Sequence, residues 1–323
     1  MKLRTSAAAA ALALAAALTL TACADDSSGD GATPSASASS SPATGAPQPT
    51  KEDVAAVDAV KVEGEAGKEP KLSFTSPLEV SAPTSRVVDE GDGAELTDKM
   101  FVTMEVVTYG GDGKKVQQST WEAGTPQSFI LGDPNFGLLT EPLTGHKVGS
   151  RVLLANSQAA QDGSTQTAVN LIEVTEASEL PPHAEGKAVT PEKGLPTVTT
   201  DDSGKPSVKI PDGYEAPKDL VAQPLVKGDG AKVKAGQSVA VQYSGWTLDG
   251  EQFDSSWERD MPFAFSTMGG VIQGWIDGVQ GQTIGSQVLL VIPADQAYGA
   301  EKNEQNPLAG QPLVFVVDIL DAR

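Results

Sequence analysis

Aromatic side chains gather in one short part of this acidic chain, beside a carboxylate. The stretch from Val241 to Phe265, VQYSGWTLDGEQFDSSWERDMPFAF, holds six rings, and Asp254 directly follows one of them. Of the sixteen Phe, Trp and Tyr residues in the sequence, nine lie between Tyr243 and Phe315. Rings in such number line either an apolar pocket, where a few polar groups orient the bound molecule, or an unusually rich core. The sequence therefore indicates a ring-lined site or a ring-filled interior.

The sequence lacks the residue patterns that other common kinds of functional site need. The two histidines, His146 and His183, fall in a predicted turn and a predicted linker, so neither a Ser-His-Asp triad nor a histidine metal site is indicated. Cys23 is the single cysteine, which excludes an intrachain disulfide. No phosphate-cradling P-loop motif occurs, and the formal net charge of −20 disfavours nucleic acid. We therefore expect no metal, no cofactor and no nucleic-acid partner.

The N-terminus has the pattern of an export signal. MKLRTSAAAAALALAAALTLTACADD opens with two positive charges, continues with an Ala/Leu run that is short for a spanning helix, and ends in small residues. Leu20-Thr21-Ala22-Cys23 also resembles the lipobox of bacterial lipoproteins, in which the cysteine carries the lipid. A plain secretory signal is the alternative. We expect residues 1–23 to be a lipoprotein signal, Cys23 to be lipidated, and the protein to be exported and anchored to the outer face of the bacterial cell membrane.

A weak internal repeat organises the remaining chain. SRVVDEGDGAEL, from Ser85, matches AQPLVKGDGAKV, from Ala222, and GHKVGSRVLLA, from Gly145, matches GQTIGSQVLLV, from Gly281. Residues 24–50 contain no bulky apolar side chain, so nothing there offsets the entropy of ordering. The predicted divisions are a flexible tether over 24–68, a first domain over 69–178, a linker over 179–194 and a second domain over 195–323.

The apolar pattern predicts the class of fold. SVAVQYSGW and LVFVVDIL alternate as strands do, and SQVLLVIP is predicted to be a more fully buried strand. Helical spacing is confined to VIQGWIDGVQG, where Ile272, Trp275 and Val279 share one face. The predicted class is α+β, with two domains that each wrap an antiparallel β-sheet around one short α-helix. Trp246 and Trp257 are expected at the rim or surface.

The second domain resembles a known family. YSGWTLDGEQFDSSWERDMPFAF, followed by GGVIQGWIDGVQGQTIGSQVLLVIPADQAYGA and then LVFVVDIL, is closely similar to the FKBP-type peptidyl-prolyl cis/trans isomerases. The similarity runs from about Lys227 to the C-terminus, and the combination of FDSS, VIxGW, AYG and LVF at fitting distances is specific. It implies an isomerase that acts on X-Pro bonds of exported polypeptides and assists their folding at the cell envelope. We expect a monomer.

The same resemblance implies the site residues. It assigns Trp275 to the floor of a proline-binding pocket and implies that the Tyr298 hydroxyl bonds a substrate carbonyl. Without the resemblance, Trp275 would be read as a core residue. The residues implied as catalytic are Tyr243, Phe253, Asp254, Trp275, Tyr298 and Phe315, and those implied as substrate-binding are Arg259, Phe263, Val271, Ile272, Ala297 and Leu308.

The chain also departs from the family pattern. The segment STMGG before Val271 is one residue short, and the flap after Tyr298 lacks the histidine and paired isoleucines often found at its tip, where Asn303, Asn306, Pro307 and Leu308 stand instead. A non-catalytic protein that holds proline-containing segments in the same pocket is therefore the alternative, and a chaperone surface on the first domain is a third possibility. The first domain, which has a shorter flap, is expected to keep the fold without activity because its aligned positions are Val106, Val116, Gln117, Gln127 and Leu139.

Overall fold

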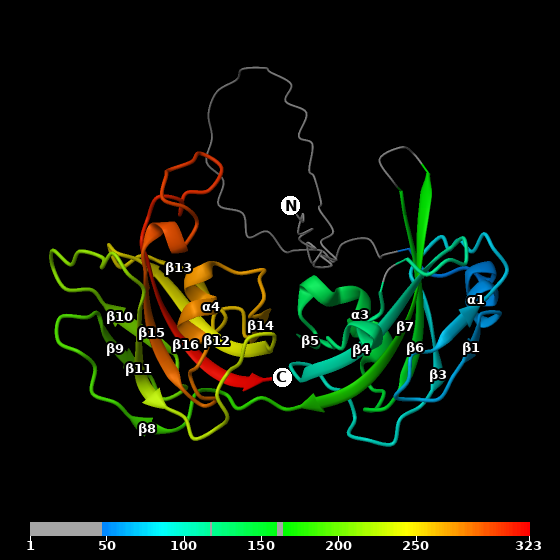
Figure 1. Ribbon diagram of the computed structural model, residues 1–323, viewed down its shortest axis with the longest axis horizontal. Helices are drawn as coiled ribbons and strands as arrows, with labels where there is room; N and C mark the ends of the chain where they lie inside the picture. The colour runs from blue at the N-terminus through cyan, green and yellow to red at the C-terminus, as the bar shows by residue number, and fades with distance from the viewer. Residues whose placement is uncertain (1–46, 117, 160–163) are drawn as a thin grey trace, which may run out of the picture. The chain divides into compact units, whose positions relative to one another are not determined.

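The computed structural model describes residues 47–116, 118–159 and 164–323. The predicted signal, Cys23 and most of the predicted tether lie outside these residues. The described part contains two lobes, each built on an antiparallel sheet (Figure 1). In this part of the chain, no helix is long and apolar enough to cross a membrane. The chain thus has antiparallel sheets and few helices, as the sequence predicts.

The first lobe is a five-stranded sheet in the order β3-β6-β7-β4-β5. A separate hairpin, β1-β2, and three α-helices accompany this sheet. The elements are α1 (Lys51–Asp58), β1 (Lys61–Glu63), β2 (Lys71–Ser73), β3 (Thr84–Asp89), β4 (Phe101–Gly110), α2 (Thr120–Ala123), β5 (Gln127–Ile130), the 3₁₀ helix η1 (Pro134–Phe136), α3 (Gly137–Leu143), β6 (Arg151–Ala159) and β7 (Thr165–Ser178).

The second lobe is a seven-stranded sheet in the order β13-β12-β16-β15-β11-β8, with β14 also paired to β12. The hairpin β9-β10 stands apart from this sheet. The elements are β8 (Lys187–Ala188), β9 (Thr197–Thr200), β10 (Pro206–Lys209), β11 (Val221–Lys227), β12 (Ser238–Thr247), β13 (Gln252–Ser255), β14 (Phe263–Ser266), α4 (Gln273–Val279), β15 (Gln287–Ile292), the 3₁₀ helix η2 (Ala294–Gln296) and β16 (Leu313–Ala322).

The two sheets share one strand order. The order β3-β6-β7-β4-β5 in the first sheet matches β11-β15-β16-β12-β14 in the second, and it places β3 and β6 at the positions of β11 and β15, the strands that the sequence repeat aligns to them. The second lobe adds β13, next to β12, β8, next to β11, and a long connection between β15 and β16. Of these, β13 and the long connection are at the predicted site.

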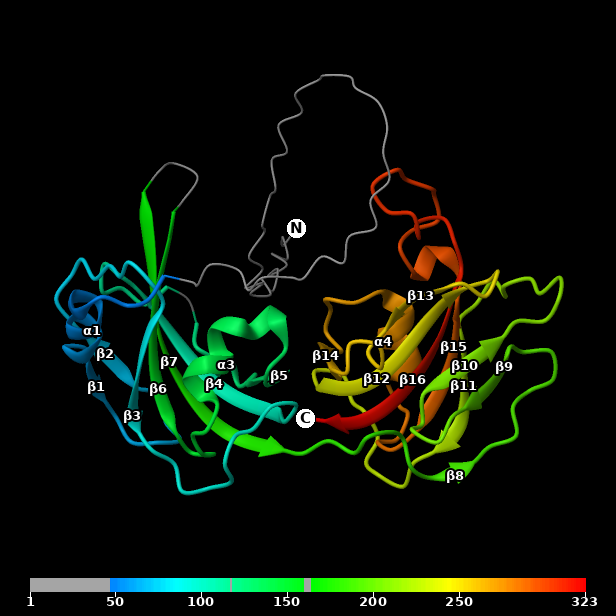
Figure 2. The same cartoon turned by 180° about the vertical axis from the view of Figure 1, so that it is seen from behind.

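Each sheet is covered on both faces. In the second lobe α4 lies on one face and the β9-β10 hairpin on the other, as both views of the molecule show (Figures 1 and 2). In the first lobe, α3 covers one face, while α1 and the β1-β2 hairpin cover the opposite one. We call the face under α3 or α4 the inner face and the other the outer face. Both faces therefore bury apolar side chains.

Several sequence predictions need correction. Residues 51–68 are not part of a tether: α1 begins there with a capping box, in which Thr50 and Asp53 bond one another's backbone N–H groups. Residues 187–188, assigned to the linker, form β8 of the second sheet. Trp246, expected at the rim, is buried in the outer-face core. Among its described residues, the first lobe has three α-helices rather than one.

Candidate functional site

A cavity of about 630 Å³ opens on the inner face of the second lobe. Its volume falls within the range of ordinary small-molecule and cofactor sites. Its walls come from strands β12, β13, β14 and β16, from the start of α4 and from the segment after η2. The lining residues are Tyr243, Phe253, Asp254, Phe263, Gly270, Val271, Ile272, Gln273, Trp275, Ala297, Tyr298 and Phe315.

Strand alternation aims the wall residues at one face. Tyr243 shares its face of β12 with the core residues Val239 and Val241, because successive side chains of a strand point to opposite sides. Gly245, next on that face, lies opposite Phe315 of β16. A Cβ atom at Gly245 would lie 2.6 Å from the Phe315 ring and 2.8 Å from the Phe253 ring. Glycine is thus needed here to leave room for both rings.

The floor of the cavity is the Trp275 indole. Helix α4 lies close to the sheet because Gly274 lacks a side chain: a Cβ there would come within 2.4 Å of Ile292. The indole meets the Tyr243 ring edge-on, with centroids 4.9 Å apart, and the Phe315 ring in the same way at 5.3 Å. Aromatic rings prefer such edge-to-face contacts over face-to-face stacking. The floor is therefore fixed by its neighbours.

One polar network stands at the rim. The Tyr243 hydroxyl donates to one oxygen of Asp254, and the Arg259 guanidinium donates to the other. Arg259 also lies 2.9 Å from the Tyr243 oxygen and 5.5 Å from the centre of its ring. The arginine charge balances that of the carboxylate, so the rim holds polar groups in place without leaving a lone buried charge.

Burial, and next the hydrogen bond to Asp254, raises the pKa of Tyr243 well above its usual value near 10. A raised pKa keeps the neutral, donating hydroxyl present to higher pH. We therefore expect the kcat/KM of this site to stay level between pH 7 and pH 10. Rates with an uncharged substrate, recorded beside circular dichroism to exclude unfolding, would check this; a fall with its midpoint below pH 10 in folded protein contradicts it.

The remaining wall comes from the connection between β15 and β16. Ala297 and Tyr298 follow η2, and the Gly310 N–H donates to the Gly299 carbonyl at 2.8 Å, which closes the base of this flap. Tyr298 is 43% exposed, the most open of the rings that line the cavity. Burial of its remaining surface and the nearby Asp254 carboxylate raise the pKa of Tyr298, so its hydroxyl is available as a donor at neutral pH.

The structure brings most of the predicted site residues together. Ten of the twelve line the cavity; Arg259 bonds two of those ten, and Leu308 packs against the aromatic core beside them. Gly270 and Gln273 also line the cavity but were not predicted. Their positions on either side of Val271 and Ile272 could have indicated this. In a turn that leads into a helix, several consecutive residues can face the same cavity.

The matching region of the first lobe lacks these features. Val106 and Leu139 are partly buried aliphatic residues where the second lobe has Tyr243 and Trp275, and Val116 is exposed. Gln117 lies outside the described residues. Residues 159 and 165 end and begin β6 and β7, so the connection between them has no room for a comparable flap. Within the described ranges of both lobes, no cluster of His, Cys, Asp or Glu could hold a metal ion.

Comparison with known proteins gives a consistent result. The model of the FKBP-type peptidyl-prolyl cis-trans isomerase family matches residues 230–320. A probable FK506-binding protein of Corynebacterium glutamicum is 40% identical over 119 residues, 36% of this chain and 98% of that protein. An FK506-binding protein of Streptomyces anulatus is 43% identical over 119 residues, 36% of this chain and 95% of that protein. The isomerase FkpA of Escherichia coli is 38% identical over 104 residues, 32% of this chain but only 38% of that protein.

Proposed function

This chain belongs to the family of FKBP-type peptidyl-prolyl cis-trans isomerases, and from that membership we propose that the Trp275 cavity is its isomerase site, acting on exported polypeptides. The observation that carries the proposal is the ring-lined cavity with a single polar network at its rim. A pyrrolidine ring is flat, apolar and of a size to lie on the indole floor. The family match and the cavity fall in the same lobe.

The chemistry suits such a pocket. An X-Pro amide must lose its C–N resonance to rotate, against a barrier of roughly 18–20 kcal/mol, so uncatalysed exchange takes tens to hundreds of seconds. The planar amide is more dipolar than the twisted one, so a dry aromatic slot favours the twisted form over the ground state. Lowering the barrier by about 5 kcal/mol would speed exchange between a thousandfold and ten-thousandfold.

The polar residues orient the substrate. Tyr298 lines the cavity and is partly exposed, and its hydroxyl serves as donor to a backbone carbonyl next to the proline. Asp254 holds Tyr243 and Arg259 so that the wall behind the proline ring keeps its shape. No bond to the substrate forms or breaks in this scheme, and no proton is transferred.

NMR exchange of a short Leu-Pro peptide, with residues 24–323 as the protein, tests this function. We expect faster cis/trans exchange with the unaltered protein, and a kcat/KM about 3- to 10-fold lower in Tyr298→Phe, because one hydrogen bond contributes roughly 0.5–1.5 kcal/mol. Tyr214→Phe, which removes a hydroxyl on the outer-face side, is the matched control. Peptide binding without faster exchange would contradict the isomerase assignment and favour a proline-segment binding protein.

The proposed location is outside the cytoplasm, on the membrane. The support is the N-terminal sequence: a basic start, an Ala/Leu run and Leu20-Thr21-Ala22-Cys23. Acyl chains bury about 0.8 kcal/mol per CH₂, so a multiply acylated Cys23 would hold the protein firmly. Proline isomerisation limits the folding of many chains, which gives an isomerase at this location a folding role.

Replacing Cys23 with serine in the producing cell should move the protein from the membrane fraction to the medium. The serine hydroxyl cannot take the lipid, while the export signal remains. Fractionation followed by immunoblotting measures this, with Ser27→Ala, four residues further along, as the control. A Cys23→Ser protein that stays in the membrane fraction after its signal has been cleaved would rule out the lipid anchor.

The first lobe is proposed as a non-catalytic copy of the same fold. The support is the shared strand order together with aliphatic residues at the positions of Tyr243 and Trp275. Without rings at those two positions and without a flap, it can contribute a packing partner or a surface for client chains, and no X-Pro pocket.

A further inference from the structure

The turn that carries Arg259 contacts the first lobe. Residues 257–261 lie between β13 and β14, and Arg259 supplies the guanidinium of the rim network. Directly after it, the Asp260 carboxylate lies 2.7 Å from the Lys99 ammonium of the first lobe. An exposed ion pair contributes little stability by itself. Its position is informative, because it joins the rim of the cavity to a lobe that supplies none of the cavity's lining residues.

The backbone on both sides of this ion pair has an unusual conformation. Lys99 has a φ of 67° and Asp260 a φ of 51°, and among the described residues they are the only ones other than glycine with a positive φ. A side chain makes this left-handed conformation unfavourable, so it persists where surrounding contacts impose it. The Lys99 N–H donates to the Leu131 carbonyl at 2.8 Å, and the Asp260 N–H donates to the Trp257 carbonyl at 3.2 Å. Two strained turns, one from each lobe, therefore meet at one contact.

An apolar cluster with members from both lobes adjoins the ion pair. It consists of Phe101, Ile130, Leu180, Ala240, Met261 and Ala264. Phe101 and Ile130 are 0% exposed, although β4 begins at Phe101 and β5 ends at Ile130. At the same register position of the second sheet stand Ser238 and Ser266. The first lobe thus has large apolar side chains where the second has small polar ones, as expected of a surface that another part of the chain covers.

Strand β14 separates this cluster from the cavity. Phe263 lines the cavity, while the next residue, Ala264, belongs to the cluster, because successive side chains of a strand point to opposite sides. Ala240 of β12 is paired with Ala264 and belongs to the cluster as well. The first lobe therefore packs against the back of one wall of the cavity.

Arg323, which follows β16, adds polar contacts to the same surface. Its guanidinium carbon lies 4.9 Å from the centre of the Phe101 ring, and the guanidinium donates to the Phe101 carbonyl at 3.2 Å. It also donates to the Ser178 hydroxyl at the end of β7 and to Asp321 of its own lobe. Cations are attracted to ring faces, and the carboxylate balances the charge of this largely buried side chain. Phe101 is thus held through both its ring and its backbone.

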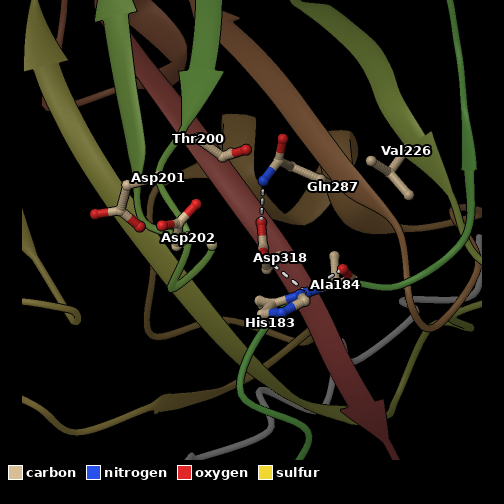
Figure 3. A pocket seen from close by; sticks show the side chains of 9 residues that line it. His183, Ala184, Thr200, Asp201, Asp202, Val226, Gln287 and Asp318 are labelled. Atoms are coloured by element: carbon tan, nitrogen blue, oxygen red, sulfur yellow. Dashed lines mark hydrogen bonds between the residues drawn. The ribbon is translucent and has the colours of Figure 1, made fainter.

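The linker between the lobes is short and fastened. The Ala184 N–H and the Gln287 amide each donate to Asp318 of β16 at 2.8 Å (Figure 3). Residues 179–183 are therefore the whole span between the end of β7 and the first bond of the linker to the second sheet. So short a connection gives the contact between the lobes a high effective concentration.

We propose that the first lobe supports the isomerase site, because Lys99, Phe101 and Ile130 fix the turn that carries Arg259 and the strand that carries Phe263. The inference rests on the proposed function, since it concerns the wall and the rim that would hold a proline ring. Lys99, Phe101 and Ile130 are positioning residues, because they pack behind the cavity and do not line it.

Hydrogen exchange of the Met261 amide in residues 24–323 measures the support without any substrate. This N–H donates to the Ser256 carbonyl at 3.2 Å and closes the turn. Phe101→Leu removes part of the contact with Met261, so we expect the opening equilibrium of this amide to rise by about 3- to 10-fold. Phe129→Leu is the matched control, because Phe129 is 1% exposed but packs in the inner-face core of the first lobe. Equal opening in the two variants would overturn the proposal.

The rate of Leu-Pro exchange measures the consequence for the site. A misplacement of about 1 Å can lower a rate a hundredfold. Since leucine keeps much of the phenylalanine volume, we expect kcat/KM in Phe101→Leu to be about 3- to 10-fold lower, with most of the loss in kcat, and Phe129→Leu to keep the unaltered value. A looser turn with an unchanged rate would contradict a support of catalysis. If the unaltered protein does not accelerate exchange, the proposed function fails, whereas the Met261 amide still decides whether the first lobe holds the turn.

The ion pair provides a second test that leaves the buried cluster unaltered. Lys99→Glu places two carboxylates together and should raise the opening of the Met261 amide by about 2- to 5-fold, the effect expected of an exposed pair. Lys99→Glu combined with Asp260→Lys restores opposite charges in exchanged positions and should return the opening to its original value. A double variant that opens as readily as Lys99→Glu would show that the two turns do not meet, and would overturn the proposal.

Discussion

Replacing Asp254 with alanine should lower kcat/KM for an X-Pro peptide by about 10- to 100-fold. The change removes the acceptor of both the Tyr243 hydroxyl and the Arg259 guanidinium. A buried polar group that loses its hydrogen-bond partner costs about 1–3 kcal/mol. If this cost adds to the free energy of the transition state, it lowers kcat/KM by roughly the stated range. NMR line-shape or magnetisation-exchange experiments at several peptide concentrations give the rate.

Asp277→Ala is the matched control for this change. Asp277 is an exposed carboxylate on α4, it bonds Gln273, and it does not line the cavity. Loss of one negative charge there should leave kcat/KM unaltered. Equal losses in the two variants would show that net charge, rather than the rim network, governs the rate.

Exchanging the floor residues of the two lobes should affect only the second. Trp275→Leu gives the second lobe the residue that the first has at Leu139, and we expect kcat/KM to fall by about 10- to 100-fold. Loss of the indole floor removes roughly 1.5–3 kcal/mol of favourable apolar contact with the substrate. A loss of that size in the transition state lowers kcat/KM by about 10- to 100-fold. Urea unfolding must accompany the assay, because a buried Trp replaced by a smaller residue also destabilises the lobe, by up to about 3–5 kcal/mol.

The reciprocal Leu139→Trp is expected to add no activity. A new indole in the first lobe would find Val106 where the second lobe has Tyr243, and the exposed Val116 where it has Phe253. A gain of exchange in Leu139→Trp combined with Trp275→Leu would mean that the first lobe holds a latent site and that its aliphatic floor alone silences it.

Much of the site could be predicted because its residues are close together in the sequence. Tyr243, Phe253, Asp254 and Phe263 fall within one stretch, and their type and spacing are specific once compared with a family. Gln273 was missed because an exposed polar residue at a helix start has many ordinary explanations, and its place next to Val271 and Ile272 was the one signal for it. The three residues of the rim network, Tyr243, Asp254 and Arg259, were implied by the resemblance rather than derived from composition.

The outer face was less predictable. Strand β12 is buried along nearly all of its length, since the segment from Leu195 to Tyr214 covers the side away from α4. Alternation within SVAVQYSGW predicts one buried face, and nothing inside the strand reveals that a segment some forty residues earlier covers the other. Trp246 was misplaced for this reason.

Because the outer face is covered, the part of the chain that matches the family and the part that can fold by itself are not the same. The part of the chain that matches the isomerase family begins at residue 230, yet Leu195, Val198, Val208 and Tyr214 bury the outer-face core around Trp246. A fragment cut at the start of the match would present Trp246, Leu289 and Val316 to water as one apolar surface. The smallest piece that can stand alone is thus larger than the piece that related proteins share, and it extends back into the chain that joins the lobes.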